Sequence, residues 1–228
     1  MQWSIERFEL EREDLQQDLK GLDLSLAECR IGDFACGWGN TSLGLMLELK
    51  CHECIGVDRF EKNTLLDVPS LEDVQEQFKE IRDMAFTSPS LLQDNKIVTE
   101  IRNLYKNERI PNFQIGDIVT GENLPSDLDF VYCKKLLQNI LEGGYSNSRH
   151  GDDGVRLAVK HIANAVKQGG QVCLIEPAGT NFMTYLEQAE FQLIRCFRIH
   201  RNEIIGQKRN MLYKAQYLIY HYSKVYKP

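Results

Sequence analysis

The sequence contains no apolar run near the roughly 20 residues that a membrane-spanning helix needs. Its first residues are charged and mixed rather than basic and then apolar, so we expect no secretory signal. It also contains no internal repeats and no low-complexity segments. With 228 residues, 43% hydrophobic and 26% charged, the chain is typical of one globular domain with a sizeable core. We therefore expect no membrane partner.

The sequence also shows no evident basic footprint of the kind that nucleic-acid-binding proteins carry. Its formal net charge is −6, and its isoelectric point is near 5.5. Both values argue against a polyanionic partner, although an acidic protein can still carry a local basic cleft. From the sequence alone we expect no nucleic-acid partner.

A second pair of closely spaced cysteines is missing. Cys51-His52-Glu53-Cys54 resembles half of a zinc site, but a structural zinc site needs four ligands, so we expect no metal here. The seven cysteines are odd in number, and Cys133, Cys173 and Cys196 lie in apolar, strand-like runs. This usage is typical of reduced thiols inside cells. We therefore expect a cytoplasmic protein.

Strand-like and helix-like segments alternate along the chain. We expect strands at 29–35, 53–57, 113–115, 128–133, 171–175, 191–199 and 212–222. Helical patterns cover 4–19, 40–49, a segment starting at Ser70, 91–107, 135–141, 153–167 and 181–189. The alternation predicts an α/β fold with a doubly wound, mostly parallel seven-stranded sheet and a C-terminal antiparallel strand pair. We expect a single domain over 1–228, with an N-terminal helical cap at 1–27 and a helical insertion at 61–110.

Acidic residues stand at or near the ends of four expected strands: Asp33, Asp58, Asp117 and Glu176. Ligands of open α/β sheets bind at the carboxyl ends of the strands. Asp58, nineteen residues after Gly39, could accept both hydroxyls of a ribose. Asp117 could accept a hydrogen bond from an adenine amino group, and Asp33 suits a cationic group better than a phosphate. Together these preferences describe a nucleoside joined to an amino acid.

The sequence resembles class I S-adenosylmethionine-dependent methyltransferases. Ile31-Gly32-Asp33-Phe34-Ala35-Cys36-Gly37-Trp38-Gly39 is similar to their first motif, with Ala35 where many members have glycine. Ile55-Gly56-Val57-Asp58 and Gly116-Asp117-Ile118 are similar to the second and third motifs. The resemblance implies S-adenosylmethionine as the cofactor. It also implies that the cofactor is bound by Asp33, Ala35, Cys36, Gly37, Gly39, Asp58, Arg59, Asp117, Ile118 and Cys133.

A nicotinamide or flavin oxidoreductase is the main alternative within this fold. The dinucleotide fingerprint has a third glycine three residues after the second, and here that position is Ser42. Asp33 would also lie unfavourably near a pyrophosphate. The residues therefore favour methyl transfer over hydride transfer.

The sequence identifies residues that would contact a substrate less clearly than those that would bind the cofactor. His150 is the candidate general base, because its ordinary pKa near 6.5 suits proton transfer, although it could also be a surface loop histidine. Trp38, Tyr145 and Glu176 are candidate substrate contacts. Trp38 could instead pack against the N-terminal helix, Tyr145 could be a loop aromatic, and Glu176 could cap the segment after Pro177. After the fourth strand the chain reads Tyr132-Cys133-Lys134-Lys135, not the Asp/Asn-Pro-Pro-aromatic tetrapeptide of many amide- and base-amino methyltransferases.

We therefore expect methyl transfer to a small-molecule acceptor. Two alternatives stay open: a methyltransferase for protein or RNA, and a non-catalytic interaction protein of the same fold. The insertion at 61–110 could form a lid over the substrate, pack on the core, or form the interface of a homodimer. The acceptor atom is not determined by the sequence.

Overall fold

The computed structural model describes residues 3–20, 28–61, 68–87, 95–143, 151–178, 181–204 and 212–225. Its seven strands form a sheet in the order β3-β2-β1-β4-β5-β7-β6. The predicted fold class is confirmed: the sheet is mixed, mostly parallel, and has an antiparallel C-terminal strand pair. The chain divides into two compact units, Met1–Asp117 and Ile118–Pro228. Each unit is described by itself below.

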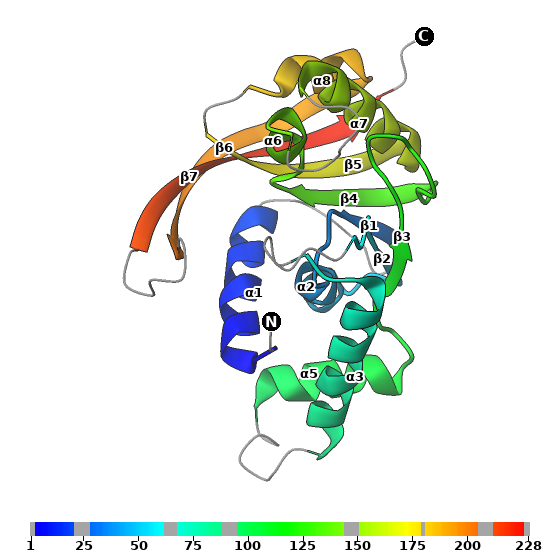
Figure 1. The fold of residues 1–228 in the computed structure, drawn as a ribbon, viewed down its shortest axis with the longest axis vertical. Coiled ribbons are helices and arrows are strands. Elements are labelled where there is room, and N and C mark those ends of the chain that lie inside the picture. Colours follow the sequence, from blue (N-terminus) through cyan, green and yellow to red (C-terminus); the bar gives the residue numbers. More distant parts are fainter. Residues whose placement is uncertain are drawn as a thin grey trace. The chain divides into compact units, whose positions relative to one another are not determined.

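The first unit contains three parallel strands and four described helices (Figure 1). The strands are β1 (Arg30–Phe34), β2 (Glu53–Asp58) and β3 (Asn112–Ile115), with Gly32 opposite Ile55 and Gly56 opposite Phe113. The helices are α1 (Ile5–Leu19), α2 (Asn40–Leu49), α3 (Leu71–Thr87) and α5 (Lys96–Lys106). Of the acids that the sequence analysis selected, Asp58 ends β2 and Asp117 follows β3, whereas Asp33 lies within β1.

Helix α3 begins with the capping box that the sequence predicts. The N–H of Asp73 donates to the hydroxyl of Ser70 at 3.2 Å, and the N–H of Ser70 donates to the carboxylate of Asp73 at 3.0 Å. Both bonds satisfy N–H groups that have no partner within the helix. Asn95 caps α5 in the same way by accepting from Ile97 and Val98.

The inserted helices α3 and α5 are part of the hydrophobic core of the first unit. Phe78 and Ile81 are buried in a cluster that includes Phe8 of α1 and Leu43 of α2, and Leu104 packs against it partly buried. The sequence analysis expected this burial under either role of the insertion, so a lid over the substrate stays a prediction.

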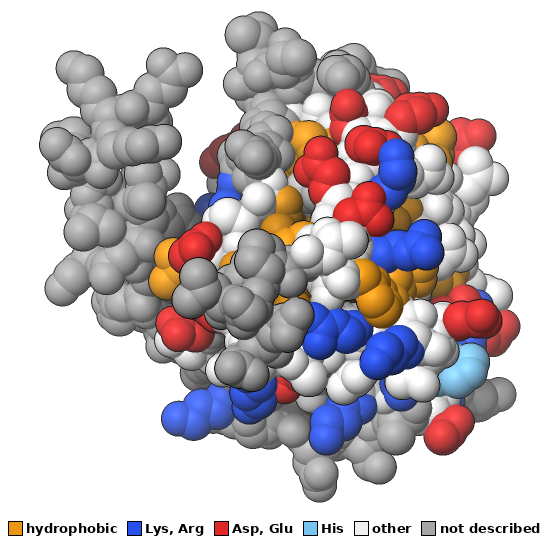
Figure 2. Space-filling view, turned by 90° about the horizontal axis from the view of Figure 1, so that it is seen from below, with side chains coloured by type: hydrophobic (Ala, Val, Ile, Leu, Met, Phe, Trp, Pro, Cys, Tyr) orange, Lys and Arg blue, Asp and Glu red, His pale blue; other side chains and the backbone are white. Residues whose placement is uncertain are grey.

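The outer surface of the insertion carries an apolar groove. Phe86 and Ile110 are 47% and 43% exposed, and they line the groove together with Tyr105. The face of the molecule in Figure 2 likewise shows hydrophobic side chains between acidic and basic ones.

The second unit contains the other four strands and three helices. The strands are β4 (Leu128–Lys134), β5 (Val166–Pro177), β6 (Phe191–Ile204) and β7 (Leu212–Lys224), and the helices are α6 (Leu136–Leu141), α7 (Gly151–Ala165) and α8 (Met183–Gln188). Strand β5 is parallel to β4 and antiparallel to β7, and β7 pairs antiparallel with β6 at the sheet edge. The expected C-terminal pair is confirmed, and both strands are longer than expected.

One expected boundary is wrong. The sequence analysis ended the helix before β5 at residue 167 and began the strand at 171, whereas α7 ends at Ala165 and β5 begins at Val166. Val166 already pairs with Leu128, and the register then shifts before Phe130 pairs with Gln171. Gly169, with φ +76°, lies in this irregular segment of the strand. Gly169 and Gly170 therefore lie in an irregular segment of β5, between Val166 and Gln171.

Among the residues that the structure describes, no helix has both the length and the apolar character that crossing a bilayer requires.

Arg12 links three helices of the first unit. Its guanidinium pairs with Glu48 of α2 and, at 2.6 Å, with Glu100 of α5. The Arg12 side chain is only 13% exposed, whereas Arg7, which pairs with Glu11 one helical turn away, is 43% exposed.

We predict that Arg12→Ala lowers the free energy of unfolding by about 1–3 kcal/mol, because it leaves two partly buried carboxylates without their partner. Arg7→Ala is the matched control and should change stability by less than about 0.5 kcal/mol. Chemical denaturation of the three proteins measures both values. Equal effects of the two substitutions would contradict the proposed link.

Candidate functional site

The candidate site centres on the turn between β1 and α2. Ala35, Gly37 and Gly39 all have left-handed backbone conformations, with φ of 62°, 53° and 77°. This conformation costs an alanine about 1–2 kcal/mol but is nearly free for glycine. The N–H groups of Ala35 and Cys36 donate to the carbonyl of Val57 in β2, at 2.8 and 3.3 Å. The turn is thereby attached to the neighbouring strand.

The two glycines of the turn have different surroundings. A Cβ atom on Gly39 would meet the ring of Phe113 at 2.5 Å and the ring of Phe78 at 3.0 Å, so this glycine is required by packing. A Cβ atom on Gly37 would meet nothing within 4 Å. Open space at Gly37 is therefore where a ligand can approach the backbone closely.

Asp58, at the end of β2, forms a hydrogen bond with Gly37. Its carboxylate accepts from the N–H of Gly37 at 2.9 Å and from the N–H of Arg59 at 2.7 Å. Burial raises the pKa of Asp58, while the bonds from Gly37, Arg59 and Phe60 and the charge of Arg59 lower it. The carboxylate therefore positions the turn and stands beside the open space.

Helix α3 holds the same turn from its other side. The buried side-chain amide of Gln77 donates to the carbonyl of Trp38 at 2.9 Å and to the side chain of Asn40 at 3.2 Å. Asn40 in turn donates to Glu11 of α1 at 2.8 Å. A chain of hydrogen bonds thus runs from α1 across the start of α2 to α3.

Asp33 lies inside β1 rather than at its rim. It is 2% exposed and accepts a hydrogen bond of 2.6 Å from the hydroxyl of Ser42 in α2. Ser42 stands at the position where the sequence analysis noted a missing third glycine. The structure shows why a polar residue is useful there: it satisfies a buried carboxylate.

Cys36 is part of the turn but is not a reactive thiol. Burial raises its pKa well above the ordinary value, and the charges of Asp33 and Asp58 raise it further. Cys51 and Cys54 are fully buried beside and within β2.

Asp117 follows β3 and pairs with Arg59, the residue next to Asp58 in the sequence. Arg59 Nε lies 3.7 Å from a carboxylate oxygen of Asp117, and the same guanidinium pairs with Glu61. Asp117 keeps 20% of its side chain exposed. It therefore remains accessible to a ligand at the carboxyl end of β3.

Three candidate residues lie in the second unit. Ile118 is buried, and its carbonyl lies 3.0 Å from Nδ1 of His161 in α7; Cys133 is buried within β4. Glu176 is fully buried and accepts from the N–H groups of Leu137 and Gln138 at 2.8 and 3.0 Å. Glu176 thus caps the start of α6 and not the segment after Pro177 that the sequence analysis considered. A contact with substrate stays a prediction.

Of the predicted cofactor and substrate residues, the first unit thus brings together Asp33, Ala35, Cys36, Gly37, Trp38, Gly39, Asp58, Arg59 and Asp117. Tyr145 and His150 lie outside the described residues. The sequence analysis missed Ser42, Gln77 and Phe113, which contact or anchor the turn and its acids.

No profile of a known protein family matches this sequence, and no curated protein is significantly similar to it. Solved structures do show its fold. A proposed RNA methyltransferase from Pyrococcus horikoshii has a TM-score of 0.57 and 17% identity, covering 95% of this chain and 84% of that protein. An S-adenosylmethionine-dependent methyltransferase from Methanosarcina mazei has a TM-score of 0.53 and 15% identity, covering 88% and 94%. The chain has the fold of class I S-adenosylmethionine-dependent methyltransferases.

The same fold also carries other reactions. A [4+2]-cyclase has a TM-score of 0.57 and 12% identity, with 95% of this chain and 81% of that one covered. Function therefore has to be argued from the site and not from the fold.

The buried Glu176 generates a prediction about pH. Burial raises its pKa to about 7, against the lowering effect of the N–H bonds from Leu137 and Gln138. Since this pKa is higher in the folded than in the unfolded protein, the folded state binds the proton more tightly. The contribution of Glu176 to stability is therefore complete below the unfolded pKa near 4.5 and is lost as pH rises through about 7.

We predict that the free energy of unfolding of the wild-type protein falls by up to about 3 kcal/mol, relative to that of Glu176→Gln, as pH rises from 4.5 to 7.5. Denaturant unfolding of both proteins across this range measures the difference, in which the other titrating groups cancel. A constant difference would show that the pKa of Glu176 is the same in the folded and the unfolded protein.

Proposed function

We propose that this protein binds S-adenosylmethionine in its first unit and transfers the methyl group to a small-molecule acceptor. The observation that carries the proposal is the open space at Gly37 beside the carboxylate of Asp58. A neighbouring strand end adds a second partly exposed acid, Asp117. Methyl-transfer chemistry would be supplied by the cofactor when bound.

The residues present fit this cofactor in shape and charge. The turn offers backbone at an open glycine, and Asp58 and Asp117 offer oxygen acceptors suited to ribose hydroxyls and an adenine amino group. Asp33 precedes the turn and Ser42 replaces the third glycine of the dinucleotide fingerprint, so this stretch is unlike a pyrophosphate site. Arg59, Ile118 and Cys133 remain proposed contacts from the family resemblance.

Positioning is the main catalytic contribution that these residues could make. Methyl transfer from a sulfonium is an in-line displacement, and holding the reacting atoms in line can supply much of the rate. A general base is required only for an acceptor that arrives protonated. His150 remains the proposed base, and Trp38, Tyr145 and Glu176 remain proposed substrate contacts.

A specific observation favours RNA as a second candidate acceptor. Residues 1–117 contain 13 Lys or Arg and 23 Asp or Glu. Residues 118–228 contain 14 Lys or Arg and 10 Asp or Glu. The second unit is therefore positively charged although the whole chain is negative.

Location in the cytoplasm, a homodimer and a lid formed by 61–110 stay predictions from the sequence.

We predict that calorimetry detects binding of S-adenosylhomocysteine, the demethylated cofactor, and that Asp58→Ala weakens it by about 1–3 kcal/mol. The reason is the loss of the ribose acceptor and of the bond to Gly37. Asp83→Ala, an exposed charge change on α3, is the control and should bind normally. If the wild type does not bind S-adenosylhomocysteine at millimolar concentration, the proposed cofactor is wrong. If Asp58→Ala binds it with unchanged affinity, Asp58 does not bind the ribose.

We also predict that Gln77→Ala weakens this binding about tenfold, roughly 1.4 kcal/mol, because the carbonyl of Trp38 and the side chain of Asn40 lose a shared donor. The exposed Gln75 of the same helix provides the control, Gln75→Ala. Circular dichroism verifies that both variants are folded. If the two variants bind equally well, Gln77 does not position the turn.

A further inference from the structure

The net charge of −6 is the sum of two unequal halves. Residues 1–117 have a formal net charge of −10 and residues 118–228 of +4. The bulk value on which the sequence analysis relied therefore conceals a basic unit. A local excess of positive charge is the electrostatic footprint of polyanion binding.

The excess is concentrated in the C-terminal strands. Strands β6 and β7 contain five Lys or Arg and only one acid, Glu203. Strand β5 pairs with β7 as far as Tyr217, opposite Pro177, but β6 and β7 continue together to Ile204 opposite Leu212. This two-stranded extension includes the positions of Arg201 and Lys214.

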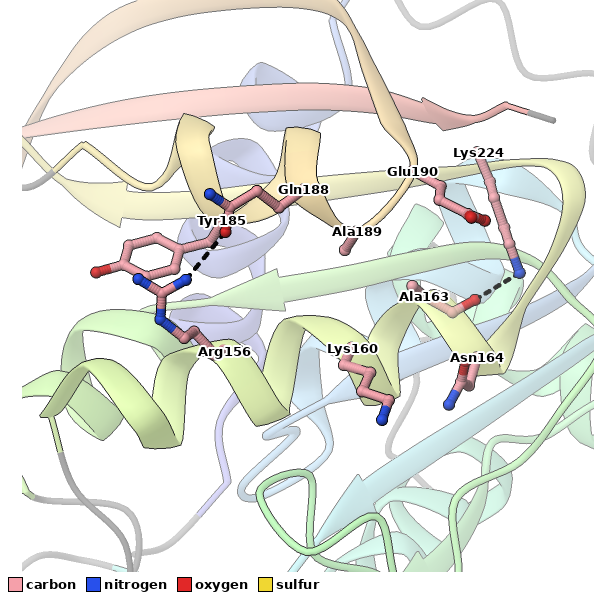
Figure 3. Close-up of a pocket in the computed structure, with 9 residues that line it drawn as sticks. All are labelled: Arg156, Lys160, Ala163, Asn164, Tyr185, Gln188, Ala189, Glu190 and Lys224. Carbon is pink, nitrogen blue, oxygen red and sulfur yellow. Dashed lines mark hydrogen bonds between the residues drawn. The ribbon is translucent and has the colours of Figure 1, made fainter. Parts of the chain in front are cut away.

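A basic pocket lies in the same unit (Figure 3). It has a volume of about 420 Å³ and is lined by Arg156, Lys160 and Asn164 of α7, Tyr185 of α8 and Lys224 of β7, among others. This volume is within the range of small-ligand sites. The basic residues come from two elements, α7 and β7, and Figure 3 shows Arg156 turned toward Gln188 and Lys224 toward Ala163. Because the lining contains three basic residues and one acid, the pocket suits an anionic group.

The described contacts hold the basic groups in place. The guanidinium of Arg156 donates to Gln188 at 3.0 Å and lies 5.2 Å from the ring centre of Tyr185. The ammonium of Lys224 donates to the carbonyls of Ala163 and Val166 at 2.7 and 2.8 Å. Glu190 is the one acid among the lining residues and is exposed. Asp152 lies next to the lining and accepts from the hydroxyl of Tyr185 at 2.9 Å. Three basic residues against these two acids leave the pocket positively charged.

We propose that the second unit binds the phosphodiester backbone of single-stranded RNA through the Arg156–Lys160 pocket and the basic strands β6 and β7. An arginine beside an aromatic ring offers both phosphate and base contacts, which is how proteins bind single strands. A lipid surface fits less well, because it requires exposed apolar side chains. Among the residues of this unit whose side chains the structure describes, only Ile194 is an exposed large hydrophobic residue.

This inference goes beyond the proposed function, since RNA binding can be measured without cofactor. The test uses fluorescence anisotropy of a 20-nucleotide single-stranded RNA with the full chain at several salt concentrations. Arg156→Gln combined with Lys160→Gln removes two charges from the pocket. Lys79→Gln combined with Lys96→Gln removes the same charge from two lysines of the first unit that are 63% and 86% exposed.

The pocket variant should bind RNA at least about fivefold more weakly at 0.1 M salt. Its slope of log affinity against log salt should be smaller by roughly 1.4, since each lost phosphate contact on a single strand contributes about 0.7. Arg198→Gln combined with Arg201→Gln should act in the same direction. The control pair should bind like wild type, and all variants should bind S-adenosylhomocysteine like wild type if the proposed function holds.

Three results would overturn the proposal: no RNA binding by wild type, equal losses in the pocket and control variants, or binding to anionic phospholipid vesicles in place of RNA. Wild type that binds RNA but not S-adenosylhomocysteine would instead refute the proposed function. The two conclusions therefore fail separately.

Discussion

The hydrogen bond between the Gly37 N–H and the Asp58 carboxylate is the interaction on which the site depends. It joins the turn after β1 to the acid after β2, so one contact fixes both the backbone that a ligand would approach and the charge beside it. The strand ladder alone could not do this, because the turn leaves the sheet at Ala35. The conformation of the turn and the direction of the carboxylate are therefore coupled.

The inserted helices support the same turn. Gln77 and Phe78, neighbours on α3, meet it by a hydrogen bond to Trp38 and by ring contact at Gly39. Phe113 of β3 fills the remaining space over Gly39 and Gly56. Gly37 is left open because the surrounding aromatic side chains pack on its neighbours. The insertion thus contributes to the shape of the site through the core, whether or not it also covers a substrate.

Much of the fold follows from sequence periodicity, and the exceptions have physical causes. The capping box at Ser70 is local, so four residues were enough to predict it. The irregular segment at Gly169 depends on pairing between Val166 and the distant Leu128, which no local pattern contains. Phe113 over Gly56 likewise depends on the register of β2 and β3.

The site residues that the sequence analysis missed differ in how clearly the sequence signalled them. Gln77 stands in a helical stripe with Val74, Phe78 and Ile81, and a polar residue within an apolar stripe was a usable signal for a buried hydrogen bond. Ser42 was noticed only as the absence of glycine, since its partner Asp33 becomes close only after β1 and α2 pack. The basic second unit was hidden because a net charge does not record where the charges lie.

The strand order also has a consequence for synthesis on the ribosome. Strand β6 is made before β7, yet β7 lies between it and the rest of the sheet. Until residues 212–224 have emerged, the fourteen residues of β6 lack their only neighbour in the sheet. Unpaired strands of this length readily associate with other chains. Pairing with β7 therefore completes the sheet and protects β6 from such association.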